Sequence, residues 1–167
     1  MSLIDKNEID VIAGFPNAWL DDVRFSLASP IYQSKAQMFI STTFPNIESL
    51  SYFDEEQMSL KVGIWQSMPY KQQLLSKYPH IKFELYSTID ALLKAAELGE
   101  VNVFVANPDF MNLKLLKENL QSLFYTLDMP TLNSMLSPLI KKGNSRLSLM
   151  INEGFKQIDV SQFVSLE

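Results

Sequence analysis

From residue 60 onward, the hydrophobic and polar positions of the chain alternate between two regular patterns. Short apolar runs indicate strands, and segments with apolar positions three or four residues apart indicate helices. In chain order they predict a strand at 60–65, a helix at 69–77, a strand at 81–86, a helix at 88–98 and a strand at 101–106. Strands that alternate with helices are typical of a parallel sheet with right-handed crossovers, so the predicted fold class is α/β.

These helices carry the start and stop residues that helix ends favour. Ser67 precedes the first helix, Ser87 or Thr88 precedes the second, and Gly99 follows it as a left-handed C-terminal stop. Gly63 lies inside a strand pattern, where the missing side chain allows another element to approach closely.

The rest of the chain is less regular. The pattern predicts strands at 9–13 and 36–41 with loop-rich chain between them, followed by a connector rich in acidic residues. After the last regular strand we expect a helix at 108–120, a strand at 122–127, an extended stretch at 133–141 and a helix at 144–158.

The composition narrows the class of protein. Of the 167 residues, 47% are hydrophobic, which is enough for a sizeable core. Nineteen acidic and 14 basic residues give a net charge of -5, which argues against nucleic acid and anionic membrane surfaces as partners. The absence of cysteine excludes disulfides and thiolate chemistry but does not identify the compartment. No apolar run reaches the roughly 20 residues that a membrane-spanning helix needs.

The sequence offers no set of residues typical of catalysis. The single histidine, His80, lies in a helix-to-strand turn without a nucleophile and carboxylate beside it. The acidic run at 54–56 lacks the alternating ligands and turn glycine of a cation site, so a solvated face is the better interpretation. No glycine-rich phosphate loop is present. We therefore expect no enzyme, no metal site and no cofactor.

The carboxyl ends of the strands are the favoured places for a ligand, because open parallel sheets bind ligands just beyond them. Segments 66–68 and 107–109 each follow a strand and open a helix, whose N–H groups can hold an anion. Ordinary helix capping is the alternative for both. The segment at 14–32 follows the first strand, and its candidates for stacking and ion pairing are Trp19, Arg24 and Tyr32, with packing as the alternative role.

Five segments in order resemble the periplasmic solute-binding proteins that take up polar amino acids and that also supply sensor domains. The segments read NEIDVIAG, SPIY, LKVGIWQSMPY, AELGEVNVFVANP and PLIKKGNSRLSLMINEGFKQI. The resemblance implies a two-lobed, hinged α/β fold in which the ligand binds between the lobes. It places residues 4–45 in part of lobe 1, 46–59 in a connector, 60–130 in lobe 2 and 131–167 in the return to lobe 1. Family members begin lobe 1 with a strand–helix–strand–helix portion that has no counterpart in this sequence, so we expect an exposed surface that a second chain, such as a homodimer partner, would cover.

The resemblance also implies a degenerate amino acid site. The family's carboxylate-binding arginine aligns with Asp21, and its ammonium-binding aspartate aligns with Asn107. Arg24 replaces the arginine only after a shift of three residues. A zwitterion needs a fixed cation and a fixed anion, and these positions supply neither. The predicted ligand-binding residues are Trp19, Arg24, Ser29, Gln66, Ser67 and Asn107.

We therefore expect a periplasmic or otherwise extracytoplasmic sensor domain of a transmembrane signalling protein. Its expected partners are a small polar molecule, either amino acid-like or a small carboxylate, and a membrane-anchored signalling module. Two alternatives remain open at this point: the solute-binding component of an ABC transporter, and a dimerisation domain that binds no ligand.

Overall fold

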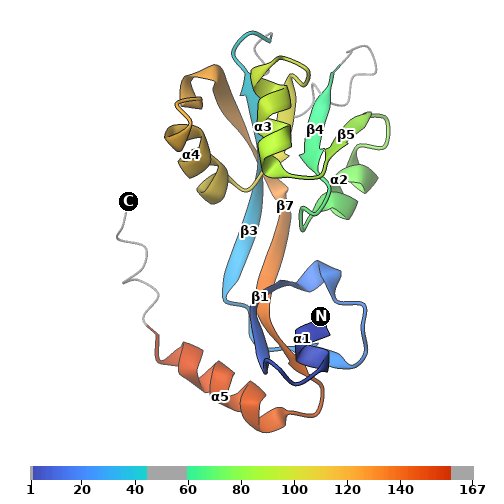
Figure 1. Cartoon of the computed structure of the whole chain (residues 1–167), viewed down its shortest axis with the longest axis vertical. Helices are drawn as coiled ribbons and strands as arrows, with labels where there is room; N and C mark the ends of the chain where they lie inside the picture. The colour runs from blue at the N-terminus through green and yellow to red at the C-terminus, as the bar shows by residue number, and fades with distance from the viewer. Residues whose placement is uncertain (1, 45–59, 159–167) are drawn as a thin grey trace. The chain divides into compact units, whose positions relative to one another are not determined.

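A computed structural model describes residues 2–44 and 60–158 of the chain (Figure 1). Contacts divide the chain into two compact units. The continuous unit is Ser34–Asn133, and the discontinuous unit combines the residues up to Gln33 with those from Ser134 onward. The predicted connector at 46–59 and the acidic run at 54–56 lie outside the described residues. The sequence had assigned 34–45 to the first lobe, whereas residues 34–44 group with the continuous unit because their strand pairs there.

The continuous unit contains a mixed sheet in the order β7-β3-β6-β4-β5. Strand β4 pairs in parallel with both β5 and β6, which confirms the predicted βαβαβ arrangement. Strand β3 pairs antiparallel with β6, and the register sets Phe39 opposite Phe104. The two rings stack at 4.9 Å, a contact worth about 0.5–1.5 kcal/mol beyond the burial of their surfaces. The strands are β3 (Tyr32–Ser41), β4 (Val62–Trp65), β5 (Phe83–Tyr86), β6 (Val103–Ala106) and the first part of β7 (Phe124–Lys141).

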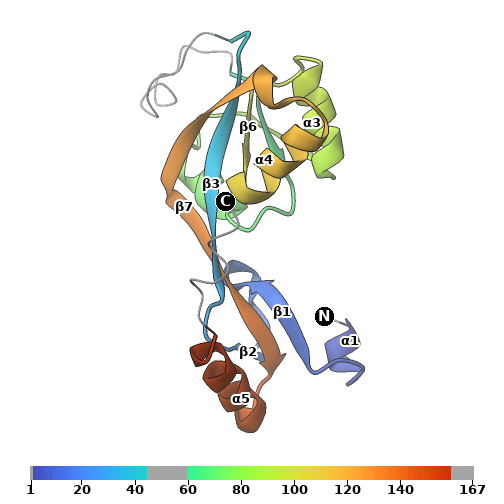
Figure 2. The same cartoon turned by 90° about the vertical axis from the view of Figure 1, so that its left-hand side faces the viewer.

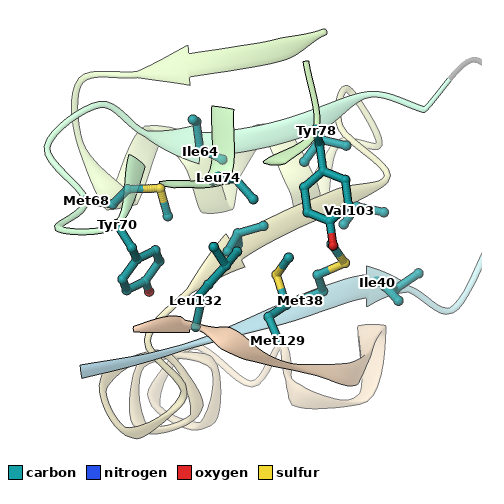
Figure 3. Close-up of a cluster of buried hydrophobic side chains, with 13 residues drawn as sticks. Met38, Ile40, Ile64, Met68, Tyr70, Leu74, Tyr78, Val103, Met129 and Leu132 are labelled. Carbon is teal, nitrogen blue, oxygen red and sulfur yellow. The ribbon is translucent and has the colours of Figure 1, made fainter. Parts of the chain in front are cut away.

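Helices cover both faces of this sheet, because successive strand residues point to opposite sides. One apolar cluster joins α3 and α4 to Phe39 and Phe104, and Figure 2 shows the two helices on the same side of the strands. The other cluster lies on the opposite face and includes Leu74 of α2 and Tyr78, which directly follows that helix (Figure 3). The helices are α2 (Lys71–Lys77), α3 (Ile89–Glu97) and α4 (Pro108–Lys117), with a short 3-10 helix η3 (Gln121–Leu123) after α4.

Two of the predicted helix-end signals are confirmed. Thr88 caps α3 by accepting a hydrogen bond from the N–H of Ala91. Gly99 ends the same helix with a φ of +73°, and the N–H of Glu100 donates to the carbonyl of Ala95. This is the Schellman arrangement, in which a left-handed residue lets the last carbonyls find donors.

The discontinuous unit is built around the second part of β7. Strands β1 (Val11–Pro16) and β2 (Phe25–Leu27) both pair antiparallel with β7. Ile4, Phe25 and Leu139 form its small core. The unit also contains α1 (Ser2–Asp5), the 3-10 helix η1 (Asn17–Trp19) and α5 (Ser145–Lys156).

Two features differ from the sequence-based expectation. Helix α1, η1 and β2 were not predicted, because elements of three or four residues carry no periodic signal. Strand β7 is continuous, although the pattern had divided it at 128–132.

Among residues 2–44 and 60–158, none of the helices has the length and apolar character of a membrane span.

Candidate functional site

Asn107 lies at the carboxyl end of β6 and uses both ends of its side-chain amide within the protein. Its Oδ1 accepts a hydrogen bond from the N–H of Phe110 at 3.1 Å, so it is the N-cap of α4. Its Nδ2 donates to the Oγ of Ser34 at 3.1 Å, and Ser34 is buried. The capping role foreseen from the sequence is thus confirmed. A ligand at this position would have to share or replace the bond to Ser34.

The loop after β4 does not open a helix as the sequence suggested. Helix α2 begins at Lys71, and Tyr70 rather than Ser67 occupies its cap position. The N–H of Gln66 donates to the carbonyl of Tyr86, and the N–H of Met68 donates to Trp65. These bonds use the N–H groups of Gln66 and Met68, and the segment is not the N-terminus of a helix. Anion binding at this segment stays a prediction.

The physical reason is burial. Met68 and Tyr70 are 4% and 1% exposed, and the chain turns to place both in the core before the helix starts. The side chains of Gln66 and Ser67 point away from that core and are exposed. Their role as ligand contacts stays a prediction.

The register of the sheet brings two candidates of the continuous unit to the same edge. Ile64 pairs with Val105 across the parallel strands β4 and β6, so Gln66 and Asn107 each follow the end of neighbouring strands. The indole N–H of Trp65 donates to the carbonyl of Ser87 at 3.3 Å, which ties the loop after β4 to the loop after β5. The two candidate side chains at this edge, Gln66 and Asn107, are neutral amides.

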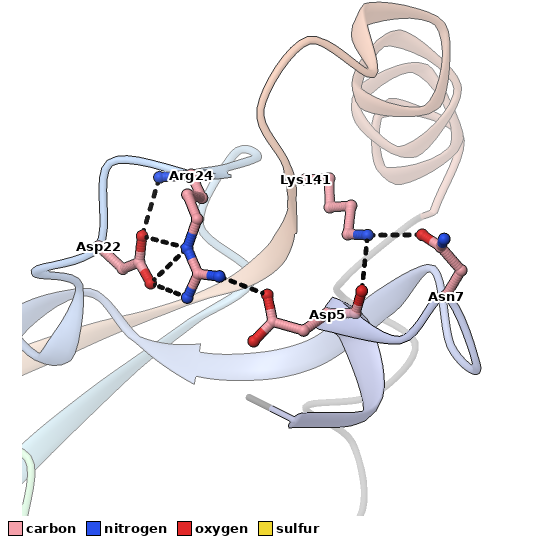
Figure 4. Close-up of polar contacts among 5 residues, drawn as sticks. All are labelled: Asp5, Asn7, Asp22, Arg24 and Lys141. Atoms are coloured by element: carbon pink, nitrogen blue, oxygen red, sulfur yellow. Dashed lines mark hydrogen bonds and ion pairs between the residues drawn. The ribbon is translucent and has the colours of Figure 1, made fainter.

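In the discontinuous unit, Arg24 is held by two carboxylates (Figure 4). Its Nε donates to Asp22 at 3.0 Å, and its Nη1 pairs with Asp5 at 3.0 Å. The hydrogen bond to Arg24 holds the pKa of Asp22 at about 2, and the pKa of Arg24 is raised in turn. The guanidinium charge is therefore already neutralised, which weakens the case for Arg24 as a clamp for a ligand carboxylate.

The same unit holds Trp19 and Ser29 by separate contacts. Trp19 lies in η1 and is 41% exposed, with its ring edge-on to Phe15 at 6.2 Å. The backbone N–H of Ser29 donates to Oδ1 of Asn152 on α5 at 2.9 Å. Asp21, at the position matched to the family's arginine, is exposed. The ligand contacts expected of Trp19, Arg24 and Ser29 stay predictions.

Several residues that shape these segments were missed by the sequence analysis. Ser34 and Asn152 pair with candidates far away in the chain, and such neutral pairs leave no local pattern. Asp22 was also missed, although its position two residues before Arg24 in a turn was a usable signal for an internal ion pair. Lys141 was missed as well. Its Nζ donates to the carbonyl of Asp5 at 3.1 Å and ties the end of β7 to α1 (Figure 4).

Two buried polar atoms at the end of β1 also lack a hydrogen-bond partner among the described residues: Oδ1 of Asn17 and Oγ of Ser137. The pairing of Phe15 with Ser137 places both close to where β1 gives way to η1. Buried polar groups normally find partners, so these atoms are additional candidates for contact with a ligand or with water.

Comparison with known proteins gives matches at the level of structure. No family model matches the chain, and no curated protein matches it. A protein of Wolinella succinogenes DSM 1740, solved as a complex with lysine, has a TM-score of 0.78 at 17% identity and covers 96% of this chain and 68% of its own. The periplasmic VFT2 domain of BvgS from Bordetella pertussis has a TM-score of 0.77 at 11% identity, with coverages of 98% and 68%. A cysteine-binding protein from Campylobacter jejuni has a TM-score of 0.70 at 16% identity, with coverages of 97% and 63%.

At these identities the likeness establishes the fold. The chain has the mixed α/β fold of periplasmic amino-acid-binding proteins, which confirms the resemblance and the fold class inferred from the sequence. The chain spans about two thirds of the length of the structures it matches, as expected for an incomplete first lobe. One match is an ancestral amino-acid-binding protein described as a precursor of cyclohexadienyl dehydratase, so the absence of enzymatic activity stays a prediction.

Proposed function

We propose that this chain is a ligand-binding domain that works outside the cytoplasm, as part of a sensor in a membrane-anchored signalling protein. The observation that carries the proposal is the shared fold with periplasmic amino-acid-binding structures. The match to a periplasmic domain of BvgS supports a place within a larger protein. In that setting, ligand binding would bias the conformation of an attached signalling module.

The proposed ligand is a small polar molecule, amino acid-like or a small carboxylate, that is bound mainly by neutral hydrogen bonds. Gln66, Ser67 and Asn107 offer hydrogen-bonding groups without charge. Arg24 already pairs with Asp5 and Asp22. High-affinity capture of a free amino acid relies on charged partners for both ends of the zwitterion, so this chemistry favours sensing over uptake.

A thermal-shift screen of the full-length protein against amino acids, polyamines and small carboxylates tests the proposal. A ligand at 100 times its Kd stabilises the folded state by about 2.7 kcal/mol. For a protein of this size, that corresponds to a rise in Tm of about 5–11 °C. If no compound of these classes raises the Tm of the full-length protein, the proposal is wrong.

Variants at Asn107 connect a shift to the predicted site. Asn107→Ser keeps an N-cap oxygen but removes the amide, and we expect it to reduce the ligand-induced shift while leaving the ligand-free Tm within about 2 °C. Asn144 is a matched control, because it caps α5 through the same hydrogen-bond geometry in the other unit. Asn144→Ser should leave the ligand response unchanged. If the ligand-induced rise in Tm is the same in both variants, Asn107 does not contact the ligand.

A second candidate function is the solute receptor of an ABC transporter. The Wolinella succinogenes structure, assigned as the binding component of such a transporter, favours it. The two roles differ in what surrounds the domain in the full-length protein. A sensor has a membrane anchor joined to an output domain, whereas a receptor has an export or lipoprotein signal and no downstream membrane helix.

A further inference from the structure

Helix α4 exposes an apolar stripe that its attachment to the sheet does not require. Phe110, Leu113 and Leu116 are 52%, 52% and 58% exposed. Met111 and Leu115, on the opposite side of the helix, are buried and hold α4 to the sheet. At 3.6 residues per turn, Phe110 and Leu116 lie about 60° to either side of Leu113. Leu113 is therefore the centre of the stripe. We call these three residues the α4 stripe.

Two charged residues of opposite sign flank the α4 stripe. Asp109 and Lys117 are both exposed, and each is four residues from Leu113 along the helix. They lie about 40° to either side of the line through Leu113, Asp109 on the side of Leu116 and Lys117 on the side of Phe110. When two copies of α4 lie antiparallel about a two-fold axis beside Leu113, Phe110 of one copy lies level with Leu116 of the other, and Asp109 lies level with Lys117. The stripe can therefore meet a second copy of itself with apolar residues against apolar residues and opposite charges at the same level.

We propose that the α4 stripe is the contact surface of a homodimer, in which α4 packs antiparallel against α4 of a second copy. In this arrangement Leu113 meets Leu113 of the second copy at the two-fold axis. Phe110 lies against Leu116 of the second copy, and Asp109 pairs with Lys117 of the second copy. An isologous contact of this kind uses one surface twice and cannot extend into a filament.

The size of the stripe sets the strength of the dimer. A helix of ten residues is about 15 Å long, so two such helices bury less than the roughly 1,200 Å² of a standard stable interface. The dimer is therefore weak and depends on concentration. If the chain belongs to a membrane-anchored sensor, as proposed above, the membrane would raise the effective concentration and favour pairing. The contact itself does not depend on the ligand.

Sedimentation velocity over a concentration series tests the dimer. The average mass should rise above the monomer value of 19.1 kDa as protein concentration increases. Leu113→Lys places two like charges at the two-fold axis and should weaken association about tenfold or more. The matched control is Leu98→Lys, because Leu98 is 63% exposed in the same unit but lies outside α4. It should leave association unchanged.

A charge exchange tests the orientation of the helices. Asp109→Lys and Lys117→Glu should each weaken association, because each creates two like-charge contacts across the axis. The double variant restores opposite charges and should associate more tightly than either single variant. A double variant no better than the singles would overturn the antiparallel arrangement, even if the protein dimerises.

A cross-link gives a measurement that does not depend on affinity. The chain has no cysteine, so Leu113→Cys introduces a single thiol. Mild oxidation should give a disulfide-linked dimer for Leu113→Cys and not for Leu98→Cys. A monomeric mass at every concentration together with no cross-link would overturn the proposal. So would association that survives Leu113→Lys and is lost on Met150→Lys, because Met150 is exposed on α5.

Discussion

Replacing Gly63 by alanine tests how closely α3 packs on β4. A Cβ atom at this position would lie 2.5 Å from Cδ1 of Leu92, 3.2 Å from Cε2 of Tyr86 and 3.3 Å from Cγ1 of Val101. Leu92 and Val101 are fully buried. Carbon atoms pack comfortably at about 3.5–4.0 Å, so the Leu92 methyl would have to retreat by roughly 1 Å within a filled core.

Two opposing terms set the size of the effect. Overpacking of a filled core costs about 1–3 kcal/mol. Alanine in a strand interior recovers about 0.5–1 kcal/mol relative to glycine. We therefore expect Gly63→Ala to lower the free energy of unfolding by about 1–2 kcal/mol. For a protein of this length, the Tm should fall by about 2–8 °C.

The control is Gly14→Ala, because a Cβ at Gly14 in β1 meets no atom within 4 Å. This variant should be neutral or more stable than the parent in urea and thermal unfolding. A double-mutant cycle with Leu92→Val then tests the cause. Shortening Leu92 should make the cost of Gly63→Ala smaller by at least about 0.5 kcal/mol. If Gly63→Ala is as stable as Gly14→Ala, or if the cycle shows no coupling, the packing argument is refuted.

Three further substitutions have definite expected outcomes. Asn119 ends α4 with a φ of 58°, so Asn119→Gly should raise the free energy of unfolding by about 0.5–1 kcal/mol in urea titration; a loss of stability would contradict this. The Asp22 carboxyl should titrate near pH 2 by NMR, and Arg24→Gln should return it toward its usual value of 3.8. Because the folded pKa is the lower one, the stability from this pair is complete above about pH 4 and is lost as the pH falls toward 2. Asn152→Ala removes the acceptor for the N–H of Ser29 and should cost about 1 kcal/mol, with faster amide exchange at Ser29 as the readout.

The predictable part of the fold is the part in which local pattern and tertiary environment agree. The strands and helices between residues 60 and 120 were predicted because their apolar faces pack against one sheet with regular periodicity. The predicted break in β7 at 128–132 contains Pro130, and a proline in a strand normally interrupts it. Pro138 lies within the stretch that was predicted as extended, opposite the shift in the register of β1 between Ile12 and Phe15. A bulge in the partner strand is not visible in the sequence of either strand.

The candidate site shows a similar division. The cap by Asn107 was predictable because a strand, an Asn-Pro pair and a helix follow one another directly in the chain. The start of α2 was not, because the burial of Met68 and Tyr70 overrides the capping signal of Ser67. The bonds from Asn107 to Ser34 and from Ser29 to Asn152 depend on chain segments far apart in sequence. Only the tertiary fold brings such neutral partners together.

The division of the chain into a continuous and a discontinuous unit has a consequence for the order of folding. The continuous unit is closed once residue 133 has been synthesised, and its central parallel strands are joined by single helices. The discontinuous unit cannot form its sheet until the second part of β7 has been synthesised, because Val11 pairs with Ile140. Pairing of such high contact order is slow, and domains that are complete early fold first during synthesis. Strands β1 and β2 therefore stay unpaired until the second part of β7 has been synthesised. A chain that ends before that part of β7 would have a folded continuous unit preceded by an unfolded N-terminal segment.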